Sequence, residues 1–334
     1  MFGKKICRWG VLLAFFFMCS LVPAATHAAR FKVLMVLGYG ESAPWGKAIQ
    51  KGAASVLAQT CKMQYFHMDT EEQPEAAREK AKEAHELYQK FQPDGVIAAN
   101  DDAQSFFVVP YLAGKVRTPV MFCAIRKGPE AYGYPVSNVS GILERYHIAE
   151  SLAFAQQLLP SVRTFGLIQK DSDSGRAVLK QIYRESDHYA ASFADFKLPN
   201  TLEQAVTMTE MLRSQCDILF TLSMEGIYDD KDQPLTDADV LPVIAKVFGK
   251  PLVSGNAHNV THGVLCAVAK SGQEQGKAAA EMLLKAMKGT PISKLPISQN
   301  RHGRRMVNTR VIKALDITPP EASLQGAELV EAGE

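Results

Sequence analysis

Short apolar runs alternate with longer amphipathic stretches from residue 31 onward. The apolar runs predicted to be strands in the first part of the chain are Phe31–Leu37, Met63–His67, Gly95–Ala99 and Pro119–Phe122. The stretches between them, predicted to be helices, are Pro44–Gln59, Gln73–Phe91 and Ala103–Lys115. Repeated strand–helix–strand units of this kind require a parallel sheet with helices on both faces. We therefore expect a doubly wound α/β lobe.

The loop Gly128–Asn138, which contains Pro129, Gly133 and Pro135, interrupts this alternation and is predicted to be a crossover. The alternation then restarts. Its predicted helices are Ile148–Leu159, Ser174–Tyr183, Thr201–Arg213 and Asp237–Phe248, and its predicted strands are Thr164–Ile168, Ala191–Phe196, Asp217–Thr221 and Pro251–Val253. Two Rossmann-like lobes in tandem indicate a ligand cleft between them. Ligands of such sheets bind beyond the carboxyl ends of the strands, so the loops after the strands are where a site is expected.

Composition and charge narrow the class of protein. The 334 residues are 47% hydrophobic and 22% charged, which is typical of a globular protein with about two domains. The formal net charge of +2 gives no overall attraction to nucleic acid, and no nucleic-acid partner is expected.

Residues 1–28 have the pattern of a secretory signal peptide. Lys4, Lys5 and Arg8 form a basic segment, residues 9–21 are mostly apolar, and small residues follow at 24–29. We expect cleavage, a periplasmic location and no membrane insertion of the mature chain. Cys19 leaves a lipoprotein as a minor alternative.

Four cysteines remain in the mature chain: Cys61, Cys123, Cys216 and Cys266. In an oxidising compartment they allow two disulfides by three pairings. Cys123 and Cys216 lie at the ends of apolar runs, where buried free thiols are equally expected, so the sequence leaves disulfide formation open.

The loops after the predicted strands supply the candidate ligand contacts. Asp101 and Glu225 occupy equivalent positions in the two lobes, where a carboxylate would pair with an ammonium group. Ser172 and Ser174 lie at a helix N-terminus, which is suited to an anionic group, although the same residues also form an ordinary helix cap. Together they favour an amino acid or a related small amine as ligand. The other candidates are Tyr39, Glu41, Trp45, Asn100 and Asn256.

Three motifs are weaker. Gly38–Ala43 fits a dinucleotide-binding spacing, but Pro44 and Trp45 follow it, so a cleft loop with an aromatic face, or a plain turn with Trp45 in the core, is favoured. Asp229–Asp232 lacks the glycine and the final acid of a calcium loop. His258 and His262 have a metal-ligand spacing without a third ligand, so neither a metal nor another cofactor is expected.

Four segments occur in a recognisable order: Asn138–Ile142, Leu158–Pro160, Gly276–Pro291 and Val307–Leu315. From Phe31 to about Ile317 the chain resembles the ABC transporter substrate-binding protein family, whose studied members bind aromatic amino acids and have the type I periplasmic-binding fold. The resemblance implies three passages of the chain between the lobes. Its implied boundaries are residues 29–142 with about 256–290 for lobe 1 and 143–255 with about 291–318 for lobe 2. The polar, acidic-leaning residues 319–334 are expected to form a flexible tail.

The resemblance also bears on partners. It implies a binding protein, not an enzyme, that closes on a small ligand and presents it to an ABC transporter permease. Asn100–Asp102, Phe122–Ile125 and Gly141–Glu144 are more similar to a branch associated with membrane sensor kinases. A module that docks onto a sensor kinase or chemoreceptor is therefore one alternative. A periplasmic α/β enzyme is another, although no catalytic pair is evident in the chain.

Overall fold

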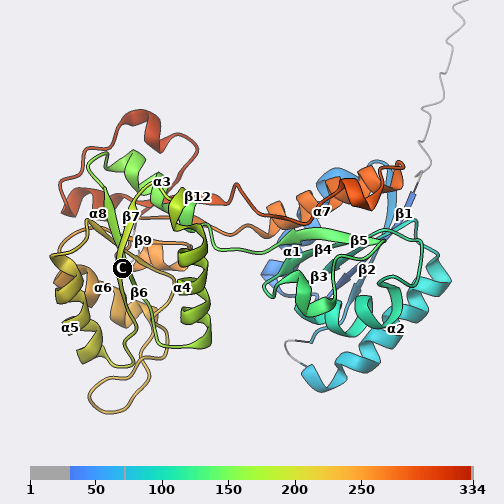
Figure 1. Ribbon diagram of the computed structural model, residues 1–334, viewed down its shortest axis with the longest axis horizontal. Coiled ribbons are helices and arrows are strands. Elements are labelled where there is room, and N and C mark those ends of the chain that lie inside the picture. Colours follow the sequence, from blue (N-terminus) through green and yellow to red (C-terminus); the bar gives the residue numbers. More distant parts are fainter. Residues whose placement is uncertain (1–30, 71–72, 332–334) are drawn as a thin grey trace, which may run out of the picture.

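The computed structural model describes residues 31–70 and 73–331, which form two lobes side by side (Figure 1). The expected signal peptide, at residues 1–28, lies outside the described residues. In the part of the chain that is described, no helix has the length and apolar character needed to cross a membrane.

Lobe 1 is built on a six-stranded sheet with the strand order β11-β5-β4-β3-β1-β2. Its strands are β1 (Phe31–Leu37), β2 (Cys61–His67), β3 (Gly95–Ala99), β4 (Val120–Ile125), β5 (Val139–Leu143) and β11 (Ser298–Gln299). Its helices are α1 (Pro44–Leu57), η1 (Pro74–Ala76), α2 (Ala77–Phe91), η2 (Ala103–Leu112), η3 (Pro129–Tyr132), α7 (Gly272–Met287) and η6 (Ile292–Lys294). All of the strand pairs are parallel.

Lobe 2 is built on a seven-stranded sheet with the order β13-β12-β10-β9-β8-β6-β7. Its strands are β6 (Thr164–Ile168), β7 (Ser192–Lys197), β8 (Ile218–Thr221), β9 (Leu252–Ser254), β10 (Cys266–Ala269), β12 (Arg304–Asn308) and β13 (Glu328–Val330). Its helices are α3 (Ile148–Leu158), α4 (Asp173–Glu185), η4 (Ser186–His188), α5 (Leu202–Arg213), α6 (Asp237–Phe248), η5 (His258–His262), α8 (Thr309–Ala314) and η7 (Glu321–Leu324). β10 and β12 form an antiparallel pair.

The apolar runs become central strands because both faces of each sheet are covered. In β1, Val33, Met35 and Leu37 pack toward α1 and α7, whereas Leu34 and Val36 pack toward α2 and η2. Alternate side chains of a strand point to opposite faces, so a strand buried on both sides must be apolar throughout. The prediction of a two-lobed, doubly wound α/β fold is confirmed.

α1 and α7 lie on one face of the lobe 1 sheet and pack so closely that their backbones are in contact. A Cβ atom on Gly276 would lie 1.9 Å from the carbonyl oxygen of Ile49, and one on Gly52 would lie 2.1 Å from that of Gln273. Only glycine fits at these two positions. The contact fixes α7 to lobe 1, although β10, which precedes it, belongs to lobe 2.

The chain passes between the lobes at three segments, Glu144–His147, Lys270–Ser271 and Asn300–Gly303, which we call the hinge. These positions correct several expectations. The loop Gly128–Asn138 joins β4 to β5 within lobe 1, so it is not the passage between lobes. Lobe 1 resumes at α7 instead of near residue 256 and continues through β11, so lobe 2 resumes at β12 instead of near residue 291.

The chain beyond residue 318 also differs from expectation. The segment predicted as a flexible tail forms η7 and then β13, which pairs in parallel with β12. The four described cysteines are free and buried, so the open question of disulfides is answered by four thiols. Burial raises the pKa of Cys216 to about 11, as expected for a thiol that acts as a small apolar side chain.

Candidate functional site

A cavity of about 530 Å³ lies beside the hinge and is lined by both lobes. Lobe 1 contributes the loop after β4 and Asp101, the hinge contributes Glu144 to Tyr146 and Lys270, and lobe 2 contributes α4. In Figure 1, α4 lies on the side of lobe 2 that faces lobe 1. The lining residues from the two lobes therefore face each other across the hinge.

The lobe 1 wall is organised by Asp101, which directly follows Asn100 at the carboxyl end of β3. The Asp101 carboxylate accepts hydrogen bonds from the backbone amides of Arg126, at 3.3 Å, and Lys127, at 3.2 Å, and from the Tyr132 hydroxyl. These bonds fix the loop after β4 in place. Asp101 thus faces the cavity, but its oxygen atoms already have donors.

The lobe 2 wall is one face of α4. Its lining residues recur at helical spacing and are Ser174, Ala177, Val178, Gln181 and Arg184. Ser172 caps this helix, accepting a hydrogen bond from the backbone amide of Gly175 at 3.1 Å. The amide group of Gln181 donates to the carbonyl of Tyr146 at 3.0 Å, so α4 is attached to the first hinge segment.

The hinge segments are joined by charged and amide side chains. Lys270 forms an ion pair with Glu144 and lies 4.4 Å above the ring of Tyr146. Asn300, in the third hinge segment, is hydrogen-bonded to the first segment. Its side chain accepts from the backbone amide of Arg145 at 2.8 Å and donates to the backbone carbonyl of Arg145 at 2.9 Å. Each passage between the lobes is therefore tied to another.

Glu274, at the start of α7, binds the third hinge segment. Its carboxylate accepts from the backbone amides of Arg301, His302 and Gly303 at 2.7, 2.8 and 2.9 Å. Burial raises the pKa of Glu274, but the hydrogen bonds from His147 and these three amides have a larger, opposite effect. The pKa of Glu274 is lowered to about 2. The carboxylate is therefore ionised throughout the physiological pH range.

The His147 ring is buried in the hinge between two carboxylates. Its Nδ1 lies 3.4 Å from Glu150, and its Nε2 lies 3.6 Å from Glu274. Burial, and the Asn300 amide nitrogen 2.7 Å from Nε2, favour a neutral ring. The two carboxylates outweigh both and raise the pKa of His147 to about 9.

A smaller cavity of about 310 Å³ adjoins the first and lies on lobe 2. The two cavities share Tyr146, Ser174 and Val178. The smaller one is also lined by the candidates Ser172, Glu225 and Asn256. Glu225 accepts a hydrogen bond from the backbone amide of Asp237 at 2.9 Å, so it holds the start of α6.

Of the nine predicted ligand contacts, five therefore line the two cavities: Asp101, Ser172, Ser174, Glu225 and Asn256. Tyr39, Glu41, Trp45 and Asn100 line neither. Tyr39 is buried in the core of lobe 1, and Glu41 is exposed. Trp45 packs against that core with Lys270 5.9 Å from its ring.

Asn100 has a structural role. Its side chain accepts from the backbone amide of Ala103 at 2.9 Å and fills the space that a Cβ on Gly38 would need. The backbone φ of Asn100 is +87°, which asparagine tolerates better than most residues. Asn100 therefore caps the turn, as the sequence allowed for one member of this cluster.

Most of the charged lining was not among the residues predicted from the sequence: Arg126, Lys127, Arg145, Arg184 and Lys270. A signal existed for four of these residues, because Arg126 and Lys127 follow β4, Arg145 follows β5 and Lys270 follows β10. The rule that sites lie after strands applies to them directly. Arg184 is inside a helix and had no such signal.

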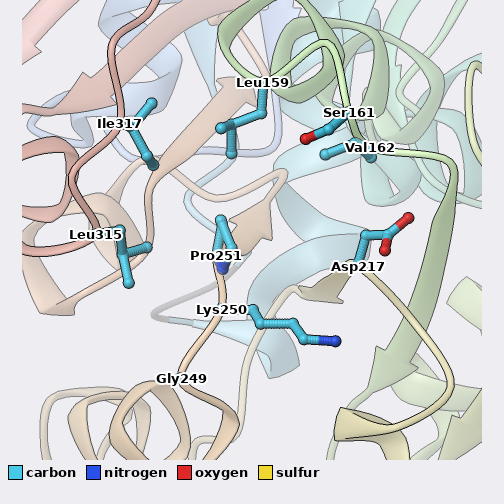
Figure 2. A pocket seen from close by; sticks show the side chains of 9 residues that line it. All are labelled: Leu159, Ser161, Val162, Asp217, Gly249, Lys250, Pro251, Leu315 and Ile317. Carbon is cyan, nitrogen blue, oxygen red and sulfur yellow. The ribbon is translucent and has the colours of Figure 1, made fainter.

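A third cavity, of about 280 Å³, lies at the amino-terminal ends of β6, β8 and β9 in lobe 2 (Figure 2). Leu159, Val162, Pro251, Leu315 and Ile317 give it apolar sides. Its charged groups already have partners. Asp217 accepts from the amides of Arg163 and Thr164, and Lys250 donates to two backbone carbonyls. This cavity is confined to one lobe and has no charge left for a polar ligand.

The described part of the chain contains no group of three or more side chains suited to a metal ion. His258 and His262 do come together in η5, with their Nε2 atoms 3.1 Å apart. His258 is exposed and His262 is half-buried, and among the described residues no third ligand joins them.

Comparison with known proteins identifies the family of this chain. Residues 112–331 match the family described as ABC transporter substrate binding protein, which is more than half of the chain. The chain belongs to this family. No curated protein matches the chain.

Solved substrate-binding proteins share the fold. A ligand-free, open substrate-binding protein with adhesive properties from Clostridium difficile is 15% identical, with a TM-score of 0.68, and 91% of this chain covers all of it. An ABC domain in complex with L-Trp from Streptococcus pneumoniae is 18% identical, with a TM-score of 0.52 over 90% of this chain and 99% of that one.

A conserved domain protein from Vibrio cholerae is 15% identical, with a TM-score of 0.51 over 90% of this chain and 100% of that one. At these identities the likeness shows the fold alone. The two lobes therefore have the type I periplasmic-binding arrangement. A family of substrate-binding proteins binds its substrates without converting them, which agrees with the prediction that the chain is not an enzyme.

Proposed function

We propose that this substrate-binding protein captures a small solute between its lobes by closing about the hinge and presents the closed form to an ABC importer. The observation that carries the proposal is the cavity of about 530 Å³ whose lining comes from both lobes and from the hinge between them. A hinge motion would bring the two walls onto a ligand that contacts both. The signal sequence predicted at residues 1–28 supports a periplasmic location for this activity.

The ligand suggested by the sequence is an amino acid or a related small amine. Its carboxylate would lie near the N-terminus of α4, where Ser174 is exposed. Its ammonium group would lie near Asp101 or Glu225. The hydrogen bonds that both acids already make to backbone amides weaken this second half of the expectation.

Thermal unfolding of the mature protein, first unfolded and refolded to remove carried ligand, tests the proposal. The solutes are amino acids, amines, purines and small carboxylates. A ligand at about a thousand times its Kd stabilises the folded state by roughly 4 kcal/mol, which raises the Tm by several degrees. Small-angle scattering should show a smaller radius of gyration with the same solute, because closure brings the lobes together.

The alternative partner is a membrane sensor kinase or chemoreceptor. It is favoured by the similarity of Asn100–Asp102 and Gly141–Glu144 to the sensor-associated branch. If no solute shifts the Tm while the ectodomain of a co-encoded sensor binds the ligand-free protein, importer delivery is wrong and docking is the function.

A further inference from the structure

The acids that line the large cavity are mostly engaged by the protein itself. Asp101 accepts from two backbone amides and a tyrosine hydroxyl, and Glu144 forms an ion pair with Lys270. A carboxylate with its oxygen atoms occupied offers little to the ammonium group of a ligand. Glu130 is the third acid of the lining.

The cations of the same cavity are less fully engaged, although the Arg145 guanidinium donates to two backbone carbonyls, those of Arg126 at 3.3 Å and Glu144 at 2.9 Å. Four of them remain after the Lys270 pair is set aside, and they are Arg126, Lys127, Arg145 and Arg184. The Nε atom of Arg126 lies 3.7 Å from Asp101, beyond hydrogen-bond distance, and the side chain is 74% exposed. Within the described chain, the Arg184 and Lys127 side chains have neither a hydrogen bond nor an ion pair.

These cations are spread over the parts that would move together. Arg126 is on lobe 1, Arg145 is on the first hinge segment and Arg184 is on α4 of lobe 2. Two causes lower the pKa of Arg145: its burial, which is the larger, and the positive charge of Arg184. The two guanidinium groups therefore already repel each other. Closure would bring three guanidinium groups together and expel water, which strengthens their repulsion.

We infer that the ligand is a small dianion, a dicarboxylate or a phosphate ester, bound by the guanidinium groups of Arg126, Arg145 and Arg184. This inference rests on the proposed capture of a solute between the lobes. A planar guanidinium group can bind two oxygens of one carboxylate or phosphate with two parallel hydrogen bonds. Hydrogen bonds between such charged groups are strong. The dianion also removes the repulsion that opposes closure, so closing depends on the charge of the ligand.

The test measures binding by titration calorimetry and thermal unfolding with four probes. Succinate and glycerol 3-phosphate represent the two sources of dianionic oxygens, L-tryptophan represents a zwitterion and putrescine represents a diamine. We expect at least one dianion to bind, with an affinity that falls as salt rises, and putrescine to leave the Tm unchanged. The better of the two dianions identifies the ligand class.

Arg184→Gln is the informative variant, because this exposed side chain makes no bond that the fold needs. Removing one charged hydrogen-bond donor should weaken the binding of the preferred dianion by roughly tenfold to a hundredfold. Lys180→Gln is the matched control. It removes the same charge from an exposed position of the same helix that does not line the cavity, and should change the affinity less than about threefold.

The outcomes separate this inference from the proposed function. If only tryptophan or putrescine binds, and Arg184→Gln leaves that binding unchanged, the dianion inference is wrong while solute capture stands. If neither dianion changes the Tm, the inference is overturned as well. If the full panel of amino acids, amines, purines and carboxylates also fails, solute capture falls with it. Equal losses in Arg184→Gln and Lys180→Gln would show a general charge effect, which also contradicts binding by Arg184.

Discussion

The hinge and the cavity wall beside it both carry charged side chains but use them differently. In the hinge, His147 lies between Glu150 and Glu274, and Lys270 pairs with Glu144. On the wall, Arg184 has no carboxylate partner among the described residues, and the exposed Arg126 has only Asp101, 3.7 Å away. Paired charges fix the three passages relative to one another. Exposed cations that are unpaired or weakly paired, in a cavity lined by both lobes, are suited to an external anion.

The largest expected effect of removing a charged side chain is on the free energy of unfolding, and it comes from a residue that binds the hinge, Glu274. Glu274→Gln replaces one carboxylate oxygen by an amide group that faces His147 and the Gly303 amide, both donors. We expect the free energy of unfolding to fall by about 3 kcal/mol, as when one member of a buried pair is removed. Urea denaturation measures the loss.

Glu281→Gln is the control for this variant. It lies on the same helix, and its ion pair with Lys277 is exposed and 4.0 Å long. Its cost should stay below roughly 0.5 kcal/mol. Equal costs in the two variants would contradict the structural role of the hinge carboxylate.

The pH dependence of the hinge is the next effect in size. The pKa of Glu274 is lowered from 4.5 to about 2. A lowered pKa in the folded state contributes stability above the unfolded value of 4.5, and this contribution is lost as pH falls toward 2. The difference in unfolding free energy between the wild type and Glu274→Gln should therefore be about 3 kcal/mol at pH 7. It should decrease toward zero as the pH falls from 4.5 to 2. A constant difference over this range would show that the charge of Glu274 is not its cause.

A smaller effect compares the acids at equivalent positions of the two lobes. Asp101 accepts from two backbone amides and a hydroxyl, whereas Glu225 accepts from one amide, that of Asp237. We expect Asp101→Asn to lower the free energy of unfolding by roughly 1–2 kcal/mol and Glu225→Gln by at most about 1 kcal/mol. If Asp101→Asn leaves stability unchanged but abolishes solute binding, Asp101 contacts the ligand, as the sequence suggested.

The sequence predicted the elements better than it predicted the use of polar side chains. The runs Phe31–Leu37 and Gly95–Ala99 are strands with the predicted bounds, because continuous burial on both faces leaves a strong apolar signal. The helix predicted at Ala103–Lys115 is a π-helix ending at Leu112, in which Pro110 supplies no amide hydrogen. Apolar periodicity does not distinguish these helix types.

The site was harder because a residue's position after a strand does not say which partner it has. Asp101 and Glu225 were correctly expected at the strand ends, but their backbone hydrogen bonds depend on how distant loops pack. Arg184 enters the cavity only because α4 faces lobe 1 (Figure 1). That orientation is a tertiary property, and no local pattern around residue 184 encodes it.

The smallest expected effect completes the contrast between the hinge and the wall. Arg184 is exposed and has no partner in the described chain, so Arg184→Gln should change the free energy of unfolding of the ligand-free protein by less than about 0.5 kcal/mol. Any change should be stabilising, because the variant removes repulsion from Arg145. Denaturation of both proteins at low and high salt measures this, since salt screens the repulsion and should bring the two values together. A loss comparable with that of Glu274→Gln would mean that Arg184 holds the fold, and the contrast between structural and ligand-binding charges would not hold.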